Sequence, residues 1–176
     1  INDPDIDIID ICTPNSCHYA VAKAALENGK HVLCEKPDAI DVTEVLKMKN
    51  AADEAGKVLM VIRNNRFVNA SQYAKKFVED GKMGEIYCGR CGWQRRRGIP
   101  GKGGWFTTKE QSGGGPLIDL GVHVIDLTRY LMGNPKPISV YGATFNKLAN
   151  RPNTHKAKGA YASISKSDKD ISDVED

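Results

Sequence analysis

The strongest constraint on the fold is an alternation, within residues 6–62, of short apolar runs and segments with helical periodicity. The runs cover residues 6–12, 31–34 and 57–62, and the segments between them are 16–28 and 41–55. Gly29 and Gly56 stand where the two helices should end, and Asp41 is a candidate N-cap. Strands separated by helices of this length run parallel with right-handed crossovers, so the pattern predicts βαβ units.

The pattern changes after residue 64. Helical periodicity predicts helices at residues 70–80 and 116–132, and alternation predicts long strands at 85–97 and 138–148 around a loop at 98–104. The predicted fold class is α/β, with a parallel sheet in residues 1–64 followed by an α+β domain in 65–176 built on a mostly antiparallel open sheet. Because the chain starts with Ile and ends without a closing element, we expect it to be the interior of a longer protein, incomplete at the C-terminus of this second domain.

Composition excludes several classes of protein. No apolar run approaches the ~20 residues of a membrane span, so we expect no membrane partner. The net charge of +3 is too small to indicate a nucleic-acid partner, and the basic triplet at 95–97 is more typical of a solvated edge or an anion clamp. Five cysteines without regular spacing favour reduced thiols in a cytoplasm. Cys88 and Cys91 would point to opposite faces of a strand, so they do not indicate a redox or zinc site.

Two motifs directly follow predicted strands, at the edge where open parallel sheets bind ligands. The first is Thr13-Pro14-Asn15, in which Asn15 or Ser16 can cap the next helix; the alternative is a plain turn. The second is Cys34-Glu35-Lys36-Pro37, in which the proline restricts the backbone of Lys36 and leaves a cis or a trans bond open. A lysine held in this way could polarise a substrate oxygen, and the alternative is a solvated ion pair.

A third motif is a narrow polar stripe on the helix predicted at 116–132. At ~100° per residue, Asp119, His123 and Asp126 share one side of an otherwise apolar helix that follows three glycines at 113–115. A hydrogen bond between Asp119 and His123 would fix the imidazole tautomer, as in a general base with its orienting acid. The alternatives are a small solvated stripe and a metal site; we predict no metal, because no further ligand cluster accompanies the stripe.

Taken together, these motifs resemble the Gfo/Idh/MocA oxidoreductases, which are named after glucose-fructose oxidoreductase, inositol dehydrogenase and a rhizopine catabolism protein. The likeness covers about residues 5–148 and is most specific at 13–18, 30–37 and 113–123. It implies a Rossmann domain that binds NAD or NADP, of which residues 1–64 are the C-terminal part, and an α/β substrate and catalytic domain in 65–176. The G-x-G-x-x-G turn that would hold the cofactor pyrophosphate is absent from the 176 residues.

The resemblance also implies roles for individual residues. Lys36 would contact both the nicotinamide and the substrate, His123 would exchange the hydroxyl proton, and Asp119 would position the substrate or the imidazole. The residues that would line the cofactor are Thr13, Pro14, Asn15, His18, Glu35, Lys36, Asn65 and Trp105.

The predicted function is NAD(P)-dependent hydride transfer between nicotinamide and a secondary alcohol of a sugar, cyclitol or related polyol. Three alternatives stay open: a non-catalytic dinucleotide- or sugar-binding protein of the same fold, a metal-dependent enzyme that uses Asp119, His123 and Asp126, and a redox-neutral elimination or glycoside cleavage at the same residues. The expected partners are the polyol or sugar and further copies of the chain in a homo-oligomer.

Overall fold

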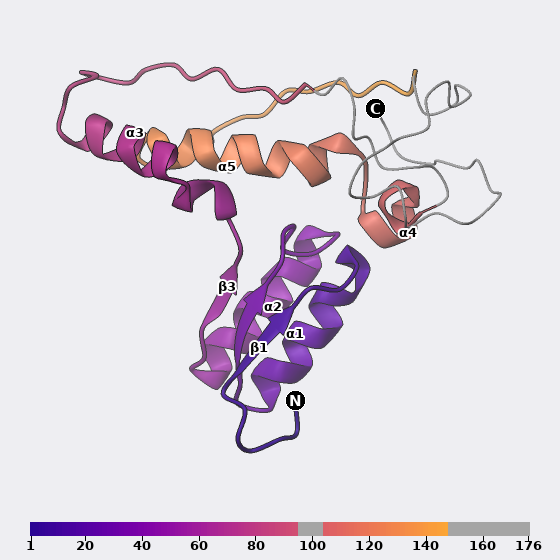
Figure 1. Ribbon diagram of the computed structural model, residues 1–176. Coiled ribbons are helices and arrows are strands. Elements are labelled where there is room, and N and C mark those ends of the chain that lie inside the picture. Colours follow the sequence, from indigo (N-terminus) through magenta and orange to yellow (C-terminus); the bar gives the residue numbers. More distant parts are fainter. Residues whose placement is uncertain (95–103, 148–176) are drawn as a thin grey trace.

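The computed structural model of the chain describes residues 1–94 and 104–147, in two lobes (Figure 1). The N-terminal lobe contains β1 (Ile8–Ile11), η1 (Asn15–Cys17), α1 (His18–Glu27), β2 (His31–Cys34), α2 (Val42–Ala55) and β3 (Leu59–Val61). The second lobe contains η2 (Asn64–Phe67), α3 (Asn69–Glu79), η3 (Trp105–Thr107), α4 (Lys109–Ser112), η4 (Leu117–Gly121) and α5 (Val122–Leu131).

The predicted βαβ units are confirmed. The three strands form a parallel sheet in the order β1-β2-β3, with Ile9 opposite Val32 and Val32 opposite Leu59. Because the order advances in one direction and such crossovers are right-handed, α1 and α2 cover the same face of the sheet, where they pack together. All three strands therefore deliver their carboxyl ends to one edge of this lobe.

The core of the N-terminal lobe lies between the sheet and these two helices. Its largest fully buried side chains are Ile11, Leu26, Met48, His18 and Cys34. Full burial of an aliphatic side chain of this size contributes ~1.5–3 kcal/mol each. The histidine is the exception in this set, because it is a polar ring among apolar neighbours and needs hydrogen-bond partners.

The ends of α2 follow the predicted capping. Asp41 accepts hydrogen bonds from the backbone N–H groups of Thr43 at 2.6 Å and Glu44 at 3.1 Å, and these bonds lower the pKa of the Asp41 carboxyl. Gly56 ends the helix at φ +61°, the left-handed conformation that favours glycine. These local signals place the loop that precedes α2, which carries Lys36.

In the second lobe the predicted helices are present, but the predicted strands are not. Helix α3 and helix α5 lie side by side, and the helix predicted at 116–132 begins as a π-helical turn, η4. No residue of 85–94 or 138–147 is assigned to a strand, so the antiparallel sheet is not confirmed. A strand requires a hydrogen-bonded neighbour, and the alternation of side chains cannot show that one is present. The predictions for 95–103, including the basic triplet, and for 148–176 lie outside the described residues.

Among the residues that the structure describes, no helix is both long and apolar enough to cross a membrane.

Candidate active site

The candidate site lies where the carboxyl edge of the parallel sheet faces η4 and α5. Asn15 follows β1, and its side chain is buried, with 4% of the residue exposed. Its amide donates a hydrogen bond at 2.8 Å to the backbone carbonyl of Ser112, 97 positions away at the end of α4. Neither η1 nor α1 has a side-chain cap, so the prediction that Asn15 or Ser16 caps the helix is wrong. The reason is that the Asn15 amide is used to join the two lobes.

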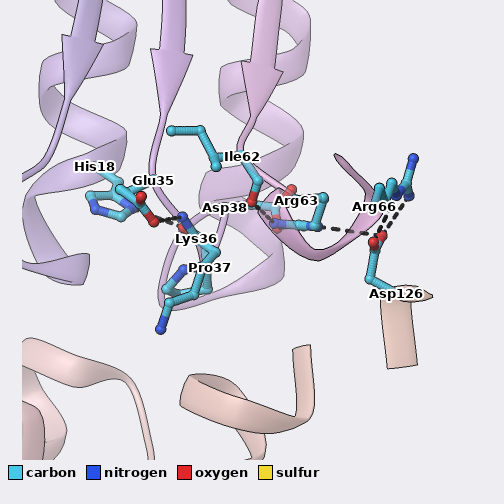
Figure 2. A network of polar contacts seen from close by, with 9 residues as sticks. All are labelled: His18, Glu35, Lys36, Pro37, Asp38, Ile62, Arg63, Arg66 and Asp126. Carbon is cyan, nitrogen blue, oxygen red and sulfur yellow. Dashed lines mark hydrogen bonds and ion pairs between the residues drawn. The ribbon is translucent and has the colours of Figure 1, made fainter. Parts of the chain in front are cut away.

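His18 joins two loops of the N-terminal lobe. Its Nδ1 lies 2.8 Å from the carbonyl oxygen of Pro37, and its Nε2 lies 3.0 Å from that of Thr13 (Figure 2 shows the ring beside Pro37). A neutral imidazole can donate only one of these two hydrogen bonds, whereas the doubly protonated ring donates both. The ring is fully buried, so in this structure it supports the loop that contains Lys36. The expectation that His18 lines a cofactor stays a prediction.

Lys36 crosses from the N-terminal lobe to the second lobe. The Lys36–Pro37 peptide bond is cis, and the Nζ of Lys36 donates to Oδ1 of Asp119 at 2.5 Å and to the Asp119 carbonyl oxygen at 3.1 Å. The side chains of Lys36 and Asp119 are only 16% and 25% exposed. The alternative of a solvated ion pair is therefore wrong. Glu35 instead accepts from the Lys36 backbone N–H, at 3.0 Å (Figure 2).

The turn that carries Asp119 is a π-helix, η4, rather than an α-helix. Because a π-turn holds an extra residue, the ~100° spacing does not apply, and Asp119 and His123 are not arranged as predicted. Asp119 is bound by Lys36, while the buried Nδ1 of His123 has no hydrogen-bond partner within the described part of the chain. Such π-turns are frequent at functional sites.

The His123 imidazole is partly buried, and two cationic and two anionic side chains act on it. Burial is the main cause that lowers its pKa, and the charge of Lys36 lowers it further; Asp119 and Glu35 act in the opposite direction. The indole of Trp93 is 6.1 Å away, centroid to centroid, tilted by 42°. A lowered pKa keeps the imidazole neutral near neutral pH, which is the form that accepts a proton.

Asp126 has a structural role that the sequence pattern did not predict. Arg66 binds it with two hydrogen bonds, Nε to Oδ2 at 2.7 Å and Nη2 to Oδ1 at 2.5 Å, and Arg63 approaches it at 3.5 Å. Arg63 also donates to Asp38 at 2.5 Å (Figure 2). Both arginines follow β3 at the carboxyl edge of the sheet, and this position was the signal that could have identified them.

The remaining predicted residues are distributed around the same edge. Thr13 and Pro14 precede η1, and Asn65 lies in η2 after β3. Trp105 is the first residue of η3, and its ring stacks on that of Phe106 with the two ring centroids 3.8 Å apart. Their contacts with a cofactor stay predictions.

Two further features bear on the chemistry. Within residues 1–94 and 104–147, no group of three His, Cys, Asp or Glu residues is placed to hold a metal ion. A largely apolar cavity of about 430 Å³ lies between α3, α5 and residues 83–90; its lining includes Phe77, Met83 and Leu131 but none of the site residues described above.

The fold and the site together define a Rossmann-like protein with a lysine and a histidine brought together from two lobes. Two family models match in succession: the oxidoreductase family with an NAD-binding Rossmann fold over residues 1–63, and the GFO/IDH/MocA C-terminal domain over 71–167. The chain belongs to the Gfo/Idh/MocA family.

Individual proteins agree with this assignment. The chain is 41% identical over 145 residues to D-glucoside 3-dehydrogenase of Escherichia coli, covering 82% of this chain and 41% of the relative. It is 36% identical over 152 residues to scyllo-inositol 2-dehydrogenase (NADP(+)) of Bacillus subtilis, covering 86% and 40%. A structure of levoglucosan dehydrogenase with NADH and levoglucosan superposes with a TM-score of 0.65 at 39% identity, covering 74% of this chain and 36% of that one. The chain thus spans about two fifths of the length of the curated relatives.

Proposed function

We propose that the protein carrying this sequence transfers a hydride between a nicotinamide dinucleotide, NAD or NADP, and a secondary hydroxyl of a sugar, cyclitol or related polyol. The observation that carries the proposal is the Lys36–Asp119 contact, which brings the lysine of the Rossmann lobe to the turn that precedes His123. The relatives named above act, by their names, on a glucoside, an inositol and an anhydrosugar, which supports this substrate class.

The residues at the carboxyl edge of the sheet fit the nicotinamide end of such a cofactor. The site combines an ammonium group, a neutral imidazole and a carboxylate, and an orphaned buried nitrogen remains on His123. When bound, the cofactor would supply the hydride acceptor. Thr13, Pro14, Asn15, His18, Glu35, Lys36, Asn65 and Trp105 are the proposed lining residues.

In the proposed reaction, His123 takes the proton of the substrate hydroxyl. The Nζ of Lys36 has three donors, of which Asp119 accepts two, so one donor can hold the substrate oxygen as negative charge develops on it. Asp119 positions Lys36 rather than the imidazole.

We propose domain limits of 1–64 and 65–176, which the two successive family matches support.

We also propose a cytoplasmic homo-oligomer. All five cysteines are free, which suits a reducing compartment. Ile138, Val140 and Tyr141 are at least 86% exposed, so the second lobe has apolar surface available for burial in the complete assembly.

The test uses the complete protein that carries this sequence. NAD(P)H formation is followed by absorbance over a panel of glucosides, anhydrosugars and cyclitols, and NADH affinity by fluorescence. We expect His123→Ala to lower turnover by ~10²–10⁴-fold with NADH affinity retained. His31→Ala is the matched control, because its ring accepts a hydrogen bond from the Val58 N–H and is not one of the site residues. NADH binding without turnover on any substrate would identify a non-catalytic binding protein, and full turnover in His123→Ala would refute the assigned base.

A further inference from the structure

One guanidinium group connects the loop of Lys36 with the helix of His123. Arg63 directly follows the last strand of the sheet, and its side chain is only 18% exposed. Its Nη2 donates to Oδ2 of Asp38 at 2.5 Å, and its Nε lies 3.5 Å from Oδ1 of Asp126 (Figure 2). The two carboxylates belong to different lobes, so Arg63 forms a bridge between them.

The bridge ends close to both proposed catalytic groups. Asp38 is two residues beyond Lys36, across the cis-proline, and Asp126 is three residues beyond His123, about one helical turn along α5. Arg63 therefore links the segment next to the ammonium group with the helical turn next to the imidazole.

Other contacts between the lobes cannot replace this one. The Lys36–Asp119 pair joins the lobes at η4, which precedes α5, so it does not hold Asp126 or the body of α5. Arg66 binds Asp126 but lies, like it, in the second lobe, so it fixes the orientation of that carboxylate for Arg63. The Asn15–Ser112 hydrogen bond joins the lobes at α4, away from α5.

We propose that Arg63 is a positioning residue for hydride transfer, which holds the Lys36 loop and the His123 helix in register through Asp38 and Asp126. The inference rests on the proposed function. It assigns to Arg63 no contact with substrate or cofactor.

The charge of Arg63 gives the bridge a second measurable effect. Burial is the largest cause that lowers the pKa of His123, and the charge of Lys36 is the next; Asp119 and Glu35 raise this pKa, and the charge of Arg63 is the smallest cause that lowers it. Removing the guanidinium charge therefore raises the pKa of the imidazole. Alcohol oxidation needs the neutral imidazole, so the acid limb of its pH profile moves to higher pH.

The experiment compares Arg63→Met and Arg63→Lys with the wild type in the complete protein. For Arg63→Met we expect kcat to fall on the order of 10²-fold, because a displacement near 1 Å between reacting groups has that effect, with NADH affinity retained and the acid limb displaced upward. Arg63→Lys keeps the charge but not the fork of donors, so its acid limb stays in place while part of the kcat loss remains. Lys49→Met is the matched control, because Lys49 and Asp53 form an exposed ion pair on α2.

The outcomes separate this inference from the proposed function. A wild-type protein without hydride transfer refutes the proposed function itself. An active wild type with unchanged kcat and an unmoved acid limb in Arg63→Met refutes the positioning role. If Arg63→Met fails to fold, Arg63→Lys decides alone: wild-type kcat would overturn the bridge, and a reduced kcat with retained NADH affinity would support it.

Discussion

Lys36 and Asp119 form a partly buried pair whose two charges should shift the pH dependence of the proposed enzyme in opposite directions. We consider Lys36→Met, which removes the ammonium at nearly unchanged length, and Asp119→Asn, which removes the negative charge and keeps the shape. The charge of Lys36 lowers the pKa of His123 and that of Asp119 raises it. For alcohol oxidation, which needs neutral His123, we expect the acid limb to move to higher pH in Lys36→Met and to lower pH in Asp119→Asn.

The two variants should also differ in how much turnover they lose. Two of the three Nζ donors of Lys36 are held by Asp119, at 2.5 and 3.1 Å, which aims the third at a substrate oxygen. Loss of such a preorganised donor typically lowers kcat by ~10²–10³-fold, or ~2.7–4 kcal/mol. Asp119→Asn retains the carbonyl of residue 119 and an amide oxygen as acceptors for Lys36. We therefore expect it to lower kcat less than Lys36→Met does, by an amount near the ~1.5–3 kcal/mol of a hydrogen bond to a charged group.

The assay is kcat/KM for alcohol oxidation as a function of pH, followed by NAD(P)H absorbance in the complete protein. Thermal unfolding of each variant serves as the control for folding. Acid limbs that move in the same direction, or a larger kcat loss in Asp119→Asn than in Lys36→Met, would contradict the electrostatic roles of the two charges.

Two predictions concern the contacts that assemble the site. Asn15→Ala removes the buried amide that donates to the Ser112 carbonyl, so we expect the free energy of unfolding in urea to fall by ~1–3 kcal/mol; an unchanged value would show that the two lobes do not depend on this bond. Gly113 has φ +84°, and a Cβ there would lie 2.9 Å from Cβ of Ile40, whereas Gly56 has φ +61° with nothing within 4 Å. Gly113→Ala should therefore lower the melting temperature more than Gly56→Ala, for which we expect a cost of ~1–2 kcal/mol, and the reverse order in a thermal unfolding experiment would refute the steric argument.

Much of the N-terminal lobe could be predicted from the sequence, because its signals are local. β-Branched runs and helical spacing gave the order of elements, and Asp41 and Gly56 gave the ends of α2. The site could be located for a similar reason: polar residues that directly follow buried parallel strands must gather at one edge of the sheet. This reasoning selected Lys36 before its partner was known.

The partners of these residues could not be predicted in the same way. An ideal α-helix paired Asp119 with His123, but the chain forms a π-turn there, and Asp119 pairs with Lys36, 83 positions earlier. Asp126 was placed in a catalytic or metal-binding stripe, yet it is held by Arg66 and Arg63. The strands expected at 85–97 and 138–148 are not confirmed, because no described residue of these ranges is assigned to a strand. A period of two shows which side chains share a face but not which strand lies beside them.

The sequence by itself determined the secondary structure of the N-terminal lobe and the presence of Lys36 and His123 as candidates, since backbone preferences and capping act over a few neighbouring residues. Only the tertiary structure decided that Lys36 binds Asp119, that His18 supports the Lys36 loop and that Arg63 bridges the lobes. These contacts join residues that are far apart in the sequence, so they depend on how distant segments pack, and the geometry of a partly buried charge pair is set by all of the groups around it.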